Sequence, residues 1–409
     1  MRPNGWPLRP DITYLNHGTV GVTPSAVLDV QAEIRARIEQ APSQFLFREA
    51  SGLVGAHPRR PSLVREAAEA IGRHVGVRGE NLVFVDNATA GINAVLGSLR
   101  FSPGDEVVML DHAYGAMVNA VRHIAGGQGA HLVTARVPYP VFSASGVVDA
   151  VRTALTPRTR LAILDHVTAE SALVLPLAEM ATVCREHGVP VLADGAHAPG
   201  MLPLDVPQLG VEWYVANLHK WACAPRSCGF LWASPGMPLD VHPPTISWGL
   251  GQGLAAEFDW VGTRDVSAWL AAPAGFEFLD RHGVQQVWDH CHGLATEGAR
   301  LLSAAWGTTC DVPESAIGFM VTVPVPAALG SDAAAATALR DALLQEHQIE
   351  VQVHAGYGRV WLRISAHLYN ERVDLERLAE AVLKVTARPL VVGAASASGR
   401  VPARQGRRP

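Results

Sequence analysis

The stretch from residue 189 to residue 229 constrains the fold of this chain more than any other. An apolar run that begins at residue 189 ends in Asp194, so a predicted strand carries a carboxylate at its C-terminal end. A second apolar run, residues 211–216, is followed by Asn-Leu-His-Lys220-Trp. Because ligands of α/β sheets bind outside the carboxyl ends of the strands, Asp194 and Lys220 are both candidates for a ligand site.

The surroundings of Lys220 favour a reactive amine. Its neighbours in the sequence are apolar and aromatic, and removal from water lowers the pKa of an ammonium group. Such a lysine is nucleophilic enough to form a Schiff base. A single lysine or aspartate at a strand end is more often part of a surface ion pair. The linked motifs Asp194-Gly-Ala-His and His-Lys220 favour instead pyridoxal phosphate, which needs a Schiff-base lysine and an acid at its ring nitrogen.

With these motifs, the chain resembles the class V aminotransferase group of fold-type I pyridoxal-phosphate enzymes. Four further segments resemble its isopenicillin N epimerase-like branch: Tyr14–Gly18, Asp111–Gly115, Gly262–Asp265 and Arg363–Asn370. The matches extend from about residue 12 to residue 385. The resemblance implies an α/β fold, with a mostly parallel seven-stranded sheet flanked by helices and a smaller α+β C-terminal domain.

The pattern of apolar residues agrees with that fold class. From residue 63, helix and strand patterns alternate, as expected for a parallel sheet covered by helices on both faces. Thr23 is expected to cap a helix that starts at Pro24, and residues 41–62 are expected to form an irregular loop. We expect an N-terminal segment (1–20) that packs with the small domain, a large cofactor-binding domain (21–266), a small domain (267–390) and a disordered tail (391–409).

Composition excludes several classes of function. A hydrophobic fraction of 48% allows a large core, and a net charge of −5 offers no footprint for nucleic acid. No apolar run is long enough to span a membrane, and no secretory signal is found at the N-terminus, so a cytoplasmic enzyme is expected. The odd number of cysteines, five, fits reduced thiols. Cys223 and Cys228 could form half of a metal site, but no second pair accompanies them, and no metal is expected.

The segment Asn87–Gly91 lies between a strand and a helix, where free backbone N–H groups favour an anion. From the residues alone, an ordinary helix cap by Asn87 or Thr89 is an equal alternative. The resemblance implies a phosphate site, for which we expect the following residues: Ala88, Thr89, Asn217 and His219. It also implies that Thr263 reaches the phosphate of a neighbouring subunit, which makes the functional unit a homodimer with shared active sites.

The resemblance also assigns residues to the cofactor ring. Asp194 is expected to stay ionised beside the ring nitrogen, and His197 to contact the ring hydroxyl, with a loop cap as the alternative for His197. Tyr114 is the candidate to stack on the ring, with His112 as a second choice. Thr168 is expected to face the ring or the aldimine.

Arg363 is the candidate for substrate binding. It lies on an apolar predicted strand, where a guanidinium is costly unless it is paired. A structural salt bridge and the α-carboxylate of an amino acid are both possible partners, and the resemblance favours the carboxylate. Asn16 and His17 are expected beside the substrate, and Lys220 is expected to act as general base after the substrate displaces it from the cofactor.

The family resemblance leaves the reaction open between four outcomes of a quinonoid: epimerisation, transamination, β-elimination and decarboxylation with deamination. The leading expectation is a C–S β-elimination lyase of specialised metabolism that acts on an α-amino acid or a cysteine S-conjugate. An epimerase needs a second acid–base group, and His17, Tyr357 and Arg48 are the candidates. Cysteine desulfurase chemistry is disfavoured because residues 354–359 contain no cysteine. A non-catalytic binding protein is the alternative from another class.

Overall fold

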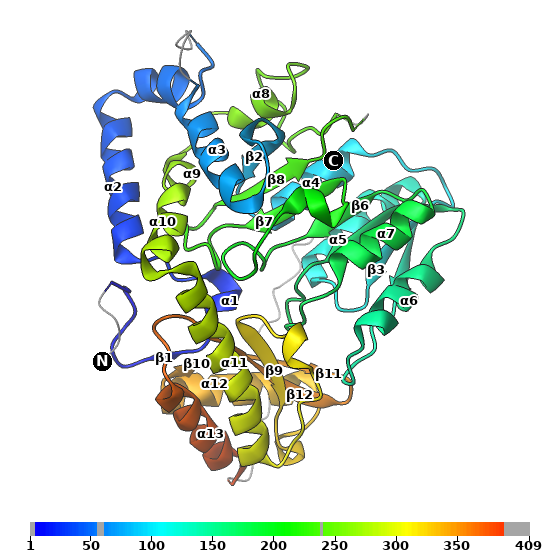
Figure 1. The fold of residues 1–409 in the computed structure, drawn as a ribbon, viewed down its shortest axis with the longest axis vertical. Coiled ribbons are helices and arrows are strands. Elements are labelled where there is room, and N and C mark those ends of the chain that lie inside the picture. The colour runs from blue at the N-terminus through cyan, green and yellow to red at the C-terminus, as the bar shows by residue number, and fades with distance from the viewer. Residues whose placement is uncertain (1–4, 55–60, 238–239, 388–409) are drawn as a thin grey trace, which may run out of the picture.

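The computed structural model describes residues 5–54, 61–237 and 240–387, and its largest element is a seven-stranded sheet with the order β2-β8-β7-β6-β5-β3-β4 (Figure 1). Its strands, in chain order, are β2 (Leu82–Val85), β3 (Glu106–Leu110), β4 (His131–Ala135), β5 (Thr159–Asp165), β6 (Val191–Asp194), β7 (Trp213–Asn217) and β8 (Gly229–Ala233). Strand β8 is antiparallel to both of its neighbours, and the other pairs are parallel. The expected mostly parallel sheet is therefore confirmed.

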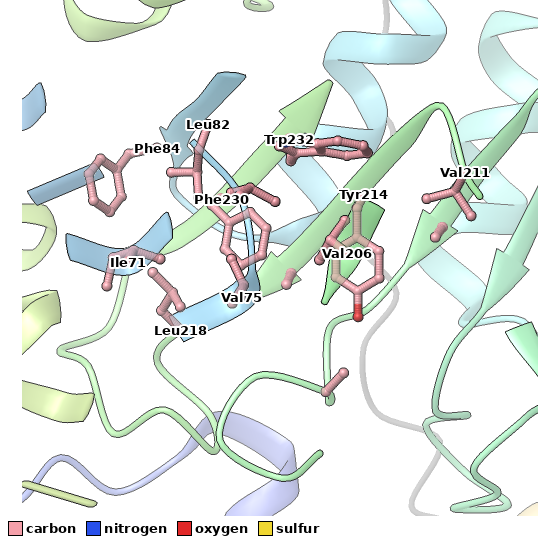
Figure 2. Packing of buried hydrophobic residues seen from close by; sticks show 14 of the residues in the cluster. Ile71, Val75, Leu82, Phe84, Val206, Val211, Tyr214, Leu218, Phe230 and Trp232 are labelled. Atoms are coloured by element: carbon pink, nitrogen blue, oxygen red, sulfur yellow. The ribbon is translucent and has the colours of Figure 1, made fainter. Parts of the chain in front are cut away.

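Helices cover both faces of this sheet. One face packs on α4 (Ala88–Ser98), α5 (Gly115–Ile124) and α8 (Leu254–Asp259). The other face packs on α3 (Leu63–Val75), α6 (Ala144–Ala154), α7 (Leu177–Glu186), α9 (Ser267–Leu270) and α10 (Ala272–His282). Figure 2 shows part of this second layer, where Ile71 of α3 lies near Leu82 and Phe84. Neighbouring strand residues enter opposite layers because strand side chains alternate between faces.

A second, smaller sheet is antiparallel, with the order β11-β12-β9. Its strands are β9 (Met320–Pro324), β11 (Gln352–Gly356) and β12 (Arg359–Ser365), and its helices are α11 (Val284–Trp306), α12 (Ala333–His347) and α13 (Arg372–Thr386). These elements share one hydrophobic cluster, and we propose that they form the small domain. The expected tail at 391–409 lies outside the described residues.

The N-terminal segment lies against the elements of the small sheet (Figure 1). Strand β1 (Thr13–Tyr14) pairs in parallel with β10 (Ile349–Glu350), and Ser365 at the end of β12 bonds to the backbone of Leu15. The short helix α1 (His17–Val20) follows. Residues 13–20 thus run from the elements of the smaller sheet toward the carboxyl edge of the larger one.

Two expectations for the next segment are wrong. Helix α2 (Ser25–Gln40) starts after Pro24, and Thr23 does not cap it, because the Thr23 hydroxyl donates to the carbonyl of Ala224 instead. Within the expected loop, Gln44–Ala50 form a π-helix whose Phe45 is buried in the core. The remaining short elements are 3₁₀-helices: Gly79–Asn81, Gly126–Gln128, Val206–Leu209, Glu314–Ala316 and Ala327–Leu329.

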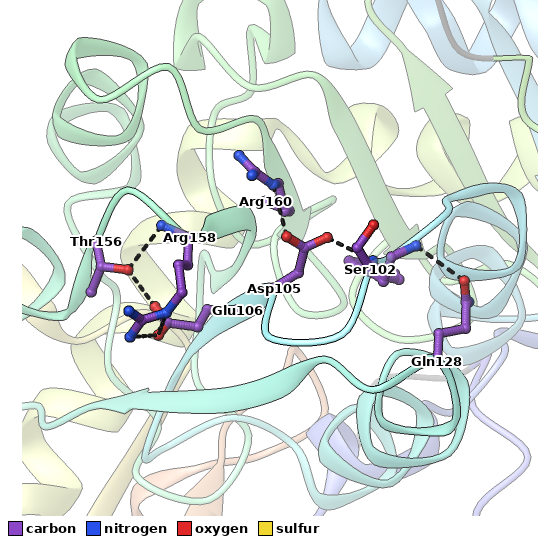
Figure 3. Close-up of polar contacts among 8 residues, drawn as sticks. Ser102, Asp105, Glu106, Gln128, Thr156, Arg158 and Arg160 are labelled. Atoms are coloured by element: carbon purple, nitrogen blue, oxygen red, sulfur yellow. Dashed lines mark hydrogen bonds and ion pairs between the residues drawn. The ribbon is translucent and has the colours of Figure 1, made fainter.

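Ion pairs tie the amino ends of β3 and β5 together, at the edge of the sheet where these two strands begin (Figure 3). The guanidinium of Arg158 lies 2.6 Å from the carboxylate of Glu106, which is buried, and Arg160 lies 3.0 Å from Asp105. Because both strands start at this edge, their carboxyl ends meet at the opposite edge. That opposite edge carries Asp165 and Asp194, which are in register on β5 and β6.

Two further properties bear on the expectations from composition. All five cysteines are free, and four of them are buried, as expected for reduced thiols. Within the described residues, no helix is both long and apolar enough to cross a membrane. Location in the cytoplasm stays a prediction.

Candidate active site

A cavity with a volume of about 160 Å³ opens at the carboxyl edge of the large sheet. It collects residues from the segments at the carboxyl ends of five strands (β2, β3, β5, β6 and β7) and from the N-terminal segment. The lining includes Thr19, Asn87, Ala88, Thr89, Tyr114, Asp165, Asp194, His197, Asn217, His219 and Lys220. Eight of the residues expected from the sequence therefore lie at one site, although the first and last of them, Ala88 and Lys220, are 132 positions apart.

The start of α4 forms one end of the cavity. Asn87 caps this helix by accepting a hydrogen bond of 2.9 Å from the N–H of Ala90, so the helix cap at Asn87 is real. The side chain of Asn217 accepts from the N–H of Ala88 at 2.9 Å. Thr89 and His219 complete this end of the lining. A helix N-terminus with hydroxyl and imidazole groups beside it can hold a phosphate.

Lys220 lines the cavity, and both its amine and its backbone carbonyl are hydrogen bonded. Its amine is 3.1 Å from Nε2 of His197. Its carbonyl accepts a hydrogen bond of 3.0 Å from Nε2 of His17, whose Nδ1 is 3.0 Å from the hydroxyl of Tyr369. Burial, with a contribution from the charge of Arg363, lowers the pKa of Lys220 to about 7. An amine with this pKa is about half unprotonated at neutral pH, and the unprotonated form can act as a nucleophile or a base.

The N-terminal segment approaches the backbone of Lys220 very closely. Gly21 has φ +70°, and a Cβ at this position would lie 1.8 Å from the carbonyl oxygen of His219. Only glycine fits such an approach with a positive φ. The resemblance placed His17 beside the substrate, but the structure places it behind Lys220, fully buried and outside the cavity lining. It supports the lysine from its backbone side.

A pair of buried carboxyl groups lies on the floor of the cavity. Asp165 and Asp194 are register partners on β5 and β6, and both line the cavity. Burial raises the pKa of both groups, and the neighbouring Asp194 raises the pKa of Asp165 further. Sequence reasoning missed Asp165. The available signal was an apolar strand ending in aspartate, the same signal that identified Asp194.

Arg363 is buried on β12 and has no carboxylate within salt-bridge distance among the described residues. Its guanidinium donates to the carbonyl of Ala169 and, at 2.8 Å, to the hydroxyl of Thr19. A longer contact of 3.4 Å reaches Asn16, and Nε has no partner. The structural salt bridge considered for this residue is therefore absent from the described contacts. Asn16 itself is buried beside Arg363 and is not part of the lining.

Arg363, Asn16 and His17 do not line this cavity, although Arg363 bonds to Thr19 and Ala169, which do. Thr168, Thr263 and the second-choice ring residue His112 also lie outside the lining. Thr168 is buried, and its hydroxyl bonds to Ser171 at 2.7 Å and accepts from the N–H of Leu173, so it stabilises a turn. His112 bonds to Ser171 and to Tyr357, which leaves Tyr114 as the aromatic candidate in the lining.

Thr263 also lies outside the lining. It is exposed, in a turn that Arg264 anchors by an ion pair to Asp86 and by packing over the ring of Trp269. The cavity of its own chain is thus formed without it.

Behind Lys220, the side chains of His17, Cys223 and His367 place possible metal ligands within 4.8 Å of one another. Both ring nitrogens of His17 are already hydrogen bonded, and Nδ1 of His367 accepts from the N–H of Leu368. These three side chains therefore form part of a buried hydrogen-bond network. Cys223 and Cys228 are both buried and free.

Comparison with known proteins gives a consistent set of relatives. The family model for class-V aminotransferases matches residues 47–378. A probable L-cysteine desulfhydrase of Arabidopsis thaliana is 33% identical over 91% of this chain and 82% of the relative. The isopenicillin N epimerase of Streptomyces clavuligerus is 32% identical over 93% of this chain and 96% of the relative.

Solved structures match the fold at lower sequence identity. The cystine C–S lyase C-DES, in complex with its product cysteine persulfide, superposes with a TM-score of 0.72 at 21% identity, covering 91% of this chain and 97% of that one. The cysteine desulfurase CsdA from Escherichia coli also gives a TM-score of 0.72, at 20% identity over 93% and 97% of the two chains.

The pKa of Lys220 can be measured directly because the sequence contains only one other lysine, Lys384. Lys384 is exposed on α13 and serves as an internal reference. We expect competitive acetylation of the unliganded protein, quantified by mass spectrometry of the two lysine peptides, to give half-maximal reactivity of Lys220 near pH 7. Reactivity of Lys220 that rises only above about pH 10, as for an ordinary lysine, would contradict the effect of burial described above.

Proposed function

Because this chain belongs to the class V aminotransferase family, we propose that its cavity holds pyridoxal 5′-phosphate through Lys220 and that the enzyme cleaves the C–S bond of cysteine or a cysteine S-conjugate. The curated relatives include L-cysteine desulfhydrases that cover nearly the whole chain.

The lining fits the cofactor at three places. The start of α4, with Thr89 and His219, suits the phosphate. Asp194 is available for the ring nitrogen, and the amine of Lys220 is available for the aldehyde carbon. Bound pyridoxal phosphate supplies an electron sink that stabilises negative charge at the substrate Cα.

The observation that carries the substrate class is the buried, unpaired guanidinium of Arg363. A charged guanidinium without an anion is costly inside a protein. The fork of N–H groups matches a carboxylate in two places, and Nε of Arg363 has no partner among the described residues. An α-carboxylate would replace the neutral partners Thr19 and Asn16 with a charged one. This supports an α-amino acid as substrate.

The elimination can be written with the residues of this chain. The neutral amine of Lys220 takes the proton from Cα of the substrate, and the electron pair of that C–H bond becomes the second bond between Cα and Cβ. The C–S bond breaks, and sulfur leaves with its electron pair and is protonated. For cysteine, one water is consumed, and hydrogen sulfide, ammonia and pyruvate are released.

The same geometry weakens two competing reactions. An epimerase needs a second acid–base group, yet none of the candidates His17, Tyr357 and Arg48 lines the cavity in the described part of the chain. A desulfurase needs a nucleophilic cysteine near β12. Strands β11 and β12 are joined there by the two residues Tyr357 and Gly358, both with positive φ, which leaves no loop for a cysteine.

Epimerisation remains the second candidate function because of one specific observation. The isopenicillin N epimerases of two bacteria are 32% identical to this chain over 96% of their own length. Tyr114 lines the cavity and is half exposed, so it is the available residue for a second proton transfer.

Product analysis distinguishes the two reactions. With L-cysteine or an S-alkyl L-cysteine, we expect the enzyme loaded with pyridoxal phosphate to release pyruvate, ammonia and a sulfide or thiol in equal amounts. We expect Lys220→Ala to release none, while Lys384→Ala, the matched lysine control, behaves as wild type. Conversion of an L-amino acid to its D-isomer without pyruvate would overturn the lyase proposal and support the epimerase.

The role of Arg363 gives a separate test. Charge-assisted hydrogen bonds are worth about 1.5–3 kcal/mol, so Arg363→Ala should lower kcat/KM at least about tenfold while the absorbance of the bound cofactor is kept. Arg363→Lys should restore only part, because an ammonium lacks the planar fork. If Arg363→Ala loses the cofactor or unfolds and kcat/KM of the remaining holoenzyme is unchanged, Arg363 has a structural role only.

We further propose that Thr263 completes the phosphate site of a second subunit. Lys220 is the only lysine or arginine in the described lining, so one chain offers little positive charge to a phosphate, and Thr263 is exposed outside its own cavity. Mixed dimers of inactive Lys220→Ala and Thr263→Ala subunits contain one site with both residues intact. We expect partial recovery of activity after mixing. No recovery despite verified subunit exchange would show that each site is made by a single chain.

A further inference from the structure

His197 lies between two nitrogen groups, and its contact with Trp221 is buried while its contact with Lys220 is partly buried. The indole Nε1 of Trp221 is 3.3 Å from Nδ1 of His197. The other ring nitrogen, Nε2, is 3.1 Å from the amine of Lys220. Trp221 is fully buried and His197 is 2% exposed. Because the indole N–H is buried against Nδ1 of His197, that ring nitrogen is its partner.

The chemistry of the indole decides the direction of both hydrogen bonds. An indole N–H can only donate, so Nδ1 of His197 must accept. A neutral imidazole carries one proton, and the accepting nitrogen cannot hold it. The proton is therefore on Nε2, which points at the amine of Lys220. That N–H can donate only to the lone pair of a neutral amine, because an ammonium has no acceptor.

We propose that Trp221 is a positioning residue that fixes His197 as the Nε2–H tautomer and thereby holds Lys220 as a neutral amine. Trp221 directly follows Lys220 in the sequence, so the same turn of the chain carries the lysine and the group that sets its partner. The proton arrangement is built into the unliganded protein and does not depend on a bound molecule.

The charges around the lysine act with and against this arrangement. Arg363 from β12 faces Lys220 and disfavours the ammonium, while Asp194 from β6 favours it. His219 on the lysine's own segment is a further titratable neighbour of His197, and burial lowers the pKa of both histidines. His17 bonds to the carbonyl of Lys220 and not to its amine. Both histidines beside the amine are thus neutral, and the tautomer of His197 decides whether it donates or accepts.

The consequence for the cofactor rests on the proposed function. When Lys220 is joined to the cofactor, Nε2–H of His197 is left as a donor on the ring side of the cavity, where a ring hydroxyl or its anion is the available acceptor. An imidazole of the opposite tautomer would present a bare nitrogen there. Trp221 would thus also select the ionised form of that hydroxyl.

The test uses the unliganded protein, so its outcome does not depend on the reaction that the enzyme catalyses. Trp221→Phe removes the indole donor and keeps an aromatic ring. Its matched control is Trp213→Phe on β7, because Trp213 is also buried and its Nε1 has no partner among the described residues. Both changes cost similar packing, but only one frees Nδ1 of His197.

We expect Trp221→Phe to raise the pKa of Lys220 by more than about half a unit, which is a threefold change in the ratio of ammonium to amine. Without the indole donor, His197 can carry its proton on Nδ1, and its unprotonated Nε2 can then accept a hydrogen bond from the ammonium. Competitive acetylation against Lys384 measures this shift. Trp213→Phe should leave the pKa of Lys220 unchanged. An equal pKa in Trp221→Phe and wild type, or equal shifts in both variants, would overturn the proposal.

A second measurement needs no tryptophan variant. Long-range ¹H–¹⁵N spectra of wild-type protein labelled with ¹⁵N-histidine distinguish the two neutral tautomers, and His197→Gln identifies the signal. We expect Nε2–H at neutral pH. An Nδ1–H tautomer, or a doubly protonated ring, would contradict the proposal even if Trp221→Phe does not fold.

Discussion

The site is governed by two cationic side chains, Lys220 and Arg363, that are removed from water near each other. Among the described residues, no carboxylate is in contact with either of them. Lys220 and Arg363 each lose the favourable hydration of their charge, and burial lowers the pKa of both, to about 7 and about 10. The amine of Lys220 therefore loses its proton near neutral pH. The guanidinium keeps its charge and is left short of an anion. The reactive amine and the carboxylate receptor that we propose would thus arise from one constraint.

That constraint is maintained by elements from three distant parts of the chain. The N-terminal segment brings Thr19 to Arg363 and His17 to the carbonyl of Lys220. The large sheet brings Asp194 and Lys220, and the small sheet brings Arg363. The close contact of Gly21 with the backbone of His219 holds the N-terminal segment against the large sheet. The site therefore exists only when both sheets and the start of the chain are packed together.

Several residues of the recognised motifs support the site and do not line it. His17 and Thr168 have satisfied hydrogen bonds in the core, the first behind the lysine and the second in a turn below it. Trp221 belongs to the same group, since it contacts His197 from outside the cavity. A motif in the sequence does not distinguish residues that line the cavity from residues that hold the lining in place, because both roles require a particular side chain at a fixed position.

The sequence by itself determined the class of fold and most of the residues of the cavity. Apolar runs that end in polar residues mark strand ends, and parallel strands bring those ends to one edge, so Asp194 and Lys220 could be placed together. Asn217 and the other expected residues of the cavity came from the family resemblance. It did not determine the hydrogen-bond partners of Arg363, the pairing of Asp165 with Asp194, or the tautomer of His197. Those depend on contacts across up to 347 positions, such as that between Asn16 and Arg363. Only tertiary packing brings such groups within hydrogen-bond distance, and it alone decides which buried group finds a partner and which is left for a ligand.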